Sequence, residues 1–154
     1  HTIDSIEVIT RLRKMGISNY DISSILATSV SQRLVRRICP NCAREREFTE
    51  EEKSIIRKIG EKYGQDFNLD GVKTYEPVGC KKCNNSGYFD RIGIFEVLII
   101  DDELKEMISE NASSYELRKK ALQNGYRPLI VDGIQKVIQG ITTLEEINNK
   151  LIIY

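Results

Sequence analysis

Residues 37–42 read RICPNC and residues 79–88 read GCKKCNNSGY, and these two stretches decide how the chain folds. Each contains two cysteines separated by two residues, Cys39 with Cys42 and Cys80 with Cys83. A two-residue spacer lets one tight turn present both sulfurs to the same ion, and zinc prefers tetrahedral coordination by thiolates. We therefore predict that the four cysteines bind one structural zinc ion, which leaves no ligand position for a catalytic water.

The two cysteine pairs are separated by 37 residues, which is longer than the loop of a common zinc ribbon. Thr49 with Glu52 forms a capping box, apolar residues follow at helical spacing, and Gly64 marks an end, so a helix is expected in this loop. Two other interpretations of the cysteines exist. One CxxC could be a redox dithiol, and four buried cysteines could be unrelated. The matched spacing of two pairs favours the metal.

Two helices are expected before the first cysteine pair. The first begins at a cap formed by Asp4 and ends at Gly16. The second begins at Ser18, runs to about Thr28, and buries the stripe Ile22, Ile25 and Leu26.

Three strands and a helical C-terminal region complete the expected mixed α/β fold. Residues 32–38 and 72–78 read as strands that lead into the cysteine pairs. Residues 91–100 carry apolar residues at both parities, which predicts a strand covered on both faces. From Asp101 onward we expect four short helices, one of them with a capping box formed by Thr142 and Glu145.

The charge balance excludes some classes of function. Lysine and arginine number 23, as do aspartate and glutamate, so no net field attracts nucleic acid or an anionic membrane. No apolar run approaches the roughly 20 residues of a membrane helix. Because no secretory signal opens the chain, four cysteines favour a reducing compartment, and we expect a cytoplasmic location.

Common catalytic motifs do not occur in these residues. The sequence contains neither GxxxxGK[ST] nor HExxH, and its one histidine is His1, at a position where a histidine is usually solvated. The residues by themselves therefore assemble no catalytic set.

Four stretches resemble the C-terminal part of the GspE/PilB family of secretion ATPases, which drive bacterial type II secretion and type IV pilus assembly. They are HTIDSIEVITRLRKMGI at 1–17, SQRLVRRICPNC at 31–42, GCKKCNNSGYFDRIGIFEVL at 79–98 and SSYELRKKALQNGYRPLIVDGIQKVIQGITTLEEI at 113–147. They follow the family's order and cover nearly the whole chain.

The resemblance implies the C-terminal fragment of a RecA-like P-loop ATPase domain, with an inserted four-cysteine zinc subdomain and a helical C-terminal subdomain. Residues 1–38 would end the nucleotide domain, 39–90 would form the zinc subdomain, 91–100 a buried core strand and 101–154 the helical subdomain. The family's Walker A and Walker B motifs would lie upstream of His1. The fragment alone should then be inactive, and ATP and Mg²⁺ belong to the full-length parent.

The resemblance also implies site residues besides the zinc ligands. His1 and Thr2 align with the start of the family's histidine box, so His1 is the implied catalytic residue. Ile3 stands where the family usually has Asn, so a contact of that Asn is lost or supplied otherwise. The strand at 32–38 would lie beside the nucleotide pocket, which makes Arg33 the implied nucleotide-binding residue. Arg36 and Arg37 could also face nucleotide or a neighbouring subunit, and a solvated strand face is favoured for Arg37.

The implied partners are further copies of the protein in a hexameric ring, together with the inner-membrane platform and assembly proteins of the machine. The protein would then lie at the cytoplasmic face of the inner membrane. An alternative function is a zinc-ribbon module that binds nucleic acid, suggested by the cysteines with Arg33, Arg36, Arg37, Lys81 and Lys82. The zero net charge and the acidic run 50–52 weaken that alternative, so no nucleic acid is expected. A purely structural adaptor is a third possible function.

Overall fold

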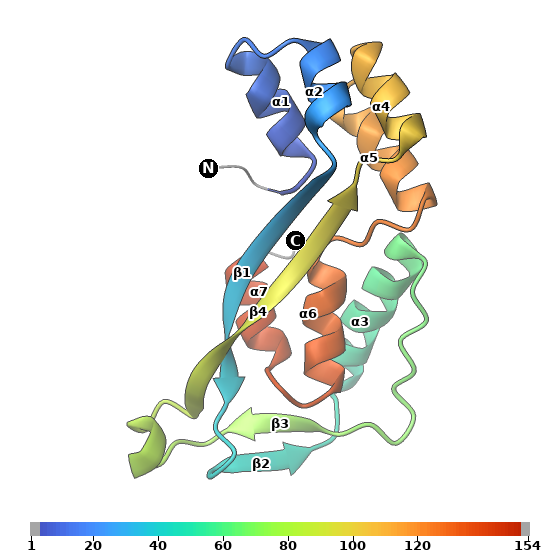
Figure 1. The fold of residues 1–154 in the computed structure, drawn as a ribbon. Helices are drawn as coiled ribbons and strands as arrows, with labels where there is room; N and C mark the ends of the chain where they lie inside the picture. Colours follow the sequence, from blue (N-terminus) through green and yellow to red (C-terminus); the bar gives the residue numbers. More distant parts are fainter. Residues whose placement is uncertain (1–3, 152–154) are drawn as a thin grey trace. The chain divides into compact units, whose positions relative to one another are not determined.

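Two long strands, β1 (Thr28–Ile38) and β4 (Tyr88–Ile99), pair with each other in the computed structural model, which describes residues 4–151. They run antiparallel, as Figure 1 shows. The chain divides into two compact units, formed by residues 1–31 with 95–128 and by residues 32–94 with 129–154. Each strand contributes one end to each unit. The predicted mixed α/β class is confirmed.

The first unit contains four helices. They are α1 (Glu7–Lys14), α2 (Asn19–Ile25), α4 (Asp102–Ser109) and α5 (Ser114–Gln123). The predicted caps are confirmed, since the Asp4 carboxylate accepts from the N–H groups of Ile6 and Glu7, and the hydroxyl of Ser18 accepts from the next turn of its helix. The helices enclose one apolar core with residues from the end of β4, among them Ile9, Leu98 and Ile108.

The second unit combines a short sheet with three helices. Its elements are β2 (Ala43–Arg46), β3 (Thr74–Pro77), α3 (Glu50–Tyr63), α6 (Leu129–Ile138) and α7 (Leu144–Leu151). Strands β2 and β3 pair antiparallel, with Ala43 opposite Pro77. Pro77 is the last residue of β3, as expected for a residue that has no N–H to donate to a sheet. The capping box of Thr49 and Glu52 that starts α3 is confirmed. A core that includes Val35, Ile56 and Ile134 joins these helices to β1 and β4.

Strand β4 corrects the prediction of a strand covered on both faces. Its side chains alternate, so that Glu96 and Leu98 are buried while Phe95, Val97 and Ile99 are exposed. The apolar residues at both parities therefore reflect one covered face and one exposed apolar face, because successive strand side chains point to opposite sides.

Two helix details also differ from the sequence predictions. Helix α2 ends at Ile25, because Leu26 already has extended backbone angles. Ile25 itself is 79% exposed, whereas the sequence predicted it to be buried. The cap of α7 is Thr143, whose hydroxyl accepts from the N–H of Glu146, one residue later than predicted. The hydroxyl of Thr142 instead donates to the carbonyl of Arg36. Among residues 4–151 no helix has the length and apolar character needed to cross a bilayer.

Candidate metal centre

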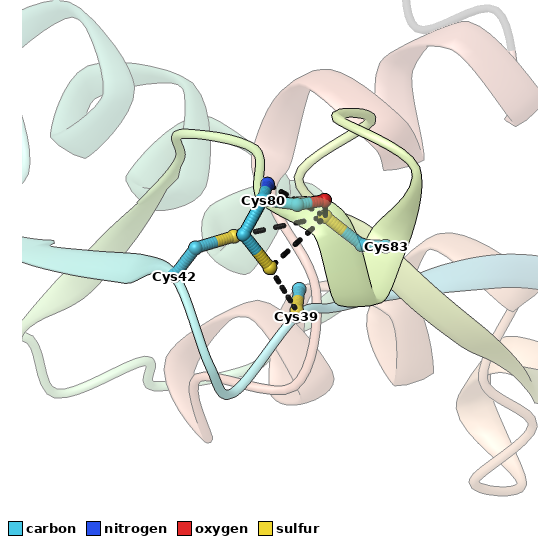
Figure 2. A group of neighbouring side chains, drawn as sticks. All are labelled: Cys39, Cys42, Cys80 and Cys83. Carbon is cyan, nitrogen blue, oxygen red and sulfur yellow. Dashed lines mark hydrogen bonds between the residues drawn. The ribbon is translucent and has the colours of Figure 1, made fainter.

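The four cysteines converge on one point in the second unit, as predicted (Figure 2). Their sulfur atoms all lie within 4.8 Å of one another. Individual Sγ–Sγ distances are 4.0 Å for Cys39 with Cys80, 3.8 Å for Cys42 with Cys83 and 3.7 Å for Cys80 with Cys83. A tetrahedral zinc ion with Zn–S bonds of about 2.3 Å requires sulfurs about 3.8 Å apart. The sulfur cluster therefore has the dimensions of a tetrathiolate zinc site.

A tight turn between β1 and β2 presents the first pair. The carbonyl of Cys39 accepts from the N–H groups of Cys42 at 3.3 Å and Ala43 at 3.0 Å. The N–H of Cys39 donates to the carbonyl of Gly87 at 2.9 Å, which ties this turn to the second one. The end of β1 thus fixes the position of Cys39, and the start of β2 fixes that of Cys42.

A single 3₁₀ turn, η1 (Lys81–Cys83), presents the second pair. The N–H of Asn85 donates to the carbonyl of Cys80 at 2.8 Å and closes the loop. Gly87 is required here, because its φ is +75° and a Cβ atom would lie 2.4 Å from the Cβ of Pro77. The NNSGY sequence therefore supplies both the positive φ angles and the close backbone approach that the turn needs.

Donors directed at the sulfurs favour their ionised form. The N–H groups of Cys80 and Gly87 donate to Cys83 Sγ at 3.2 and 3.3 Å, and Asn41 Nδ2 donates to Cys80 Sγ at 3.3 Å. Burial by itself would raise the pKa of Cys83, but these two N–H donors outweigh it and lower the pKa to about 6. The hydrogen bond from Asn41 is the largest cause that lowers the pKa of Cys80. These donors favour the thiolate form of both sulfurs, which is the form that binds metal.

The pKa of Cys42 shifts in the opposite direction. Burial raises the pKa of Cys42 to about 12, although the N–H of Gly79 donates to its sulfur at 3.3 Å. Binding of a divalent cation would displace this proton, since a coordinating thiol is deprotonated. Four protein sulfurs complete a tetrahedron, so the arrangement fits a structural ion rather than a catalytic one.

The other predicted site residues are His1 and Arg33. His1 is outside the described residues. Arg33 is exposed on β1, and its guanidinium donates to the carbonyl of Gln32. The structure does not bring it to the cysteines, and its nucleotide-binding role stays a prediction.

Arg36 contacts a buried carboxylate, while its own side chain is 43% exposed. Its backbone N–H donates to Glu146 Oε1 at 2.9 Å, and its Nε and Nη2 atoms donate to Glu146 Oε2 at 2.8 and 2.6 Å. Its guanidinium also lies 4.0 Å from the ring centroid of Tyr88, whose hydroxyl bonds with that of Thr143 at 2.9 Å. Glu146 is 1% exposed. This network holds α7 against the strand residues that flank both cysteine pairs.

Sequence reasoning missed this network, because Arg36 and Glu146 are 110 residues apart and no local pattern links them.

Known proteins match this chain over nearly all of its length. The family described as "Type II/IV secretion system protein" matches residues 1–149. The chain is 37% identical over 147 residues to the type IV pilus assembly ATPase PilB of Thermus thermophilus, covering 96% of this chain and 16% of that protein. It is 40% identical over 148 residues to the type II secretion system protein E of Aeromonas hydrophila, covering 96% and 28%.

A third relative is the type II secretion system ATPase E of Vibrio cholerae. It is 38% identical over 149 residues, which cover 96% of this chain and 27% of that protein. The chain therefore spans less than a third of the length of each of these relatives, between 16% and 28%.

Proposed function

The chain belongs to the type II/IV secretion system protein family, and from that premise we propose that it is the C-terminal part of a hexameric ATPase that powers type II secretion or type IV pilus assembly. The observation that carries the proposal is the cluster of four sulfurs within 4.8 Å of one another, inside a sequence matched to this family from residue 1 to 149. The names of the relatives include both secretion and pilus ATPases, so the proposal covers both machines.

Residues 1–38 and the strand at 91–100 would end a RecA-like nucleotide domain. The apolar face formed by Phe95, Val97 and Ile99 supports this, because an exposed apolar face of this kind is ordinarily covered by another part of a protein or a partner. Residues 39–90 would be the zinc subdomain and residues 101–154 the helical subdomain. His1 would then belong to the catalytic histidine box, and Arg33 would face the nucleotide.

ATP and Mg²⁺ would act in the full-length protein. A P-loop cradles phosphates with backbone N–H groups and a lysine, and no GxxxxGK[ST] sequence occurs in these residues. The chain alone should bind no ATP and hydrolyse none, whereas the full-length protein should show Mg²⁺-dependent hydrolysis. Turnover by the isolated chain that survives further purification would contradict the first expectation. A full-length protein without ATPase activity would contradict the second.

The metal would serve as a structural staple. Cys39 and Cys42 hold one end of the loop and Cys80 and Cys83 hold the other, and zinc bound to all four would lock both turns together. Elemental analysis of the protein, purified without chelator, should find one zinc ion per chain. Less than a tenth of an ion would overturn this role.

The zinc subdomain would also contact partners, which we propose to be the platform and assembly proteins at the cytoplasmic face of the inner membrane. An open hollow of about 550 Å³ lies beside the metal centre, and its lining includes Arg37, Tyr75, Phe89 and Asp90. It offers aromatic surface together with one cation and one anion, a composition suited to a protein partner.

A binding assay tests this surface directly. The full-length Phe89→Ser variant should bind the cytoplasmic domain of the platform protein at least about tenfold more weakly, the loss of one buried aromatic anchor. The matched control is Tyr115→Ser, which alters an aromatic side chain that is 74% exposed on α5. Equal binding by both variants and the wild type would show that the hollow is not the contact.

A further inference from the structure

The α6–α7 loop, residues 139–143, is hydrogen-bonded to the end of strand β1. The N–H of Ile38, the last residue of β1, donates to the carbonyl of Ile141 at 2.9 Å. The hydroxyl of Thr142 donates to the carbonyl of Arg36 at 2.8 Å. These two hydrogen bonds attach the loop to the residues directly before the first cysteine pair.

The same loop also contacts the segment that follows the second cysteine pair. The hydroxyls of Thr143 and Tyr88 form a hydrogen bond of 2.9 Å. Tyr88 begins β4 directly after Gly87. The N–H of Gly87 donates to Cys83 Sγ at 3.3 Å, and its carbonyl accepts from the N–H of Cys39 at 2.9 Å. One loop is therefore bonded to both sides of the metal centre.

The loop and the start of α7 bury three polar side chains. Thr142 is fully buried, Thr143 is 6% exposed and Glu146 is 1% exposed. Arg36 on β1 is bonded to Thr142 and to Glu146, and Tyr88 on β4 is bonded to Thr143. A buried polar group without its partner costs free energy, and two such atoms about 3.6 Å apart no longer form a hydrogen bond. The attachment of α7 therefore depends on the positions of these strand ends to within about 1 Å.

Binding of an ion by the four cysteines would fix these strand ends. Cys39 directly follows β1, and Cys83 accepts a hydrogen bond from Gly87, the residue before β4. Two sulfurs bound to one tetrahedral ion lie at a set distance from each other. The ion would therefore also set the distance between the end of β1 and the start of β4.

We infer that the α6–α7 loop couples the metal centre to helix α7, with Thr142 as the positioning residue of the loop. A bound ion holds the strand ends where the polar groups of the loop reach them, and the loop holds the strand ends where the sulfurs converge. Linkage makes this coupling equal in both directions, so a contact that anchors the loop also strengthens metal binding. The inference rests on the proposed structural role of zinc. It adds that the ion controls the attachment of a helix outside the loop between the cysteine pairs.

The first experiment measures native-state hydrogen exchange of the 154-residue chain with one equivalent of zinc and after chelation with its thiols kept reduced. Removal of zinc should speed the exchange of the Ile147 amide, which donates to the carbonyl of Thr143 in the first turn of α7, at least about tenfold. The matched control is the Leu117 amide, which donates to the carbonyl of Ser113 in the first turn of α5, in the other unit. It should change less than about twofold. Unchanged exchange in α7, or an equal acceleration in α5, would overturn the inference.

The second experiment measures zinc affinity by competition with a chromogenic chelator. Thr142→Val should weaken zinc binding at least about fivefold, because it removes the hydrogen bond that holds the carbonyl of Arg36. Thr142→Ser keeps the hydroxyl and should stay within about twofold of the wild type. The control is Ile56→Val, which removes one methyl group from the same unit's apolar core and no hydrogen bond, and it should also stay within about twofold.

The outcomes separate this coupling from the proposed role of the metal. Wild-type zinc affinity in Thr142→Val, or an equal loss in Ile56→Val, would overturn the coupling and leave zinc as the staple of the two turns. A wild-type chain that binds no zinc would overturn both. The exchange experiment uses the wild-type chain alone, so it decides the question even where a variant fails to fold.

Discussion

Removal of the metal should open the loop between the two cysteine pairs. The loop contains 37 residues, numbers 43 to 79, and a metal bound by the four cysteines would join its ends. A cross-link that closes a loop of about 40 residues restricts the unfolded chain by about 4 kcal/mol. Without the ion, the four residue pairs of the β2–β3 ladder remain, and an isolated two-stranded sheet is marginal in water. We therefore expect a loss of at least about 4 kcal/mol, a large part of a typical stability of about 5–15 kcal/mol.

Urea unfolding of matched samples measures this loss. The samples are the chain loaded with one equivalent of zinc, the same chain after chelation with its thiols kept reduced, and the double variant Cys80→Ser with Cys83→Ser. Native-state hydrogen exchange should show that protection disappears from the amides of β2 and β3 in the two metal-free samples. Asn41→Ala is the matched control, because it removes the donor to Cys80 Sγ and leaves all four ligands. It should still bind one equivalent of zinc.

The outcome that refutes the reasoning is equally specific. A reduced, metal-free chain with the same urea midpoint as the loaded chain would show that the ion is not a staple. So would unchanged exchange protection in β2 and β3. Contacts within the chain would then hold the two turns together without the metal.

Three further predictions concern contacts around this centre. Glu146→Ala should destabilise the chain by about 2–4 kcal/mol in urea unfolding, because it leaves a paired arginine without its buried carboxylate, and a loss below about 1 kcal/mol would contradict the network. Gly87→Ala should abolish stoichiometric zinc binding in elemental analysis, whereas Gly71→Ala, with a similar positive φ but open space around it, should retain it. The hydrogen bond from Arg46 lowers the pKa of Glu52 below its ordinary 4.5, so the stability it contributes is present above about pH 4.5 and disappears as the pH falls through the lowered pKa. The difference in unfolding free energy between wild type and Glu52→Gln should therefore be about 1 kcal/mol at pH 7 and shrink as the pH falls through that lowered pKa, and a difference independent of pH would contradict this.

Local signals in the sequence predicted much of the fold. The capping box that begins α3 is present, and the glycines at positions 16 and 64 have the positive φ expected after a helix. These features involve residues three or four apart, so the chain needs no distant partner to form them. The strand β2 was missed because its residues, ARER, carry no apolar alternation and form a strand only opposite β3.

Errors in the sequence predictions arose where distant residues chose between similar local options. Thr142 and Thr143 are both able to cap α7, and each has a glutamate three residues later. Arg36 decides between them. Its carbonyl accepts from the hydroxyl of Thr142, and its guanidinium binds Glu146, three residues after Thr143. Similarly, the pattern of β4 does not reveal which of its faces the helices cover.

The sequence by itself determined the four candidate metal ligands and several helix caps of this protein, because CxxC spacing and capping residues act within one turn of the backbone. The tertiary structure alone decided which polar groups are buried together, such as Glu146 with Arg36 and Glu96 with Ser5. Those pairs are separated by 110 and 91 residues, and no local pattern encodes a partner at that distance. A buried carboxylate is stable only beside the donors that the completed fold brings to it.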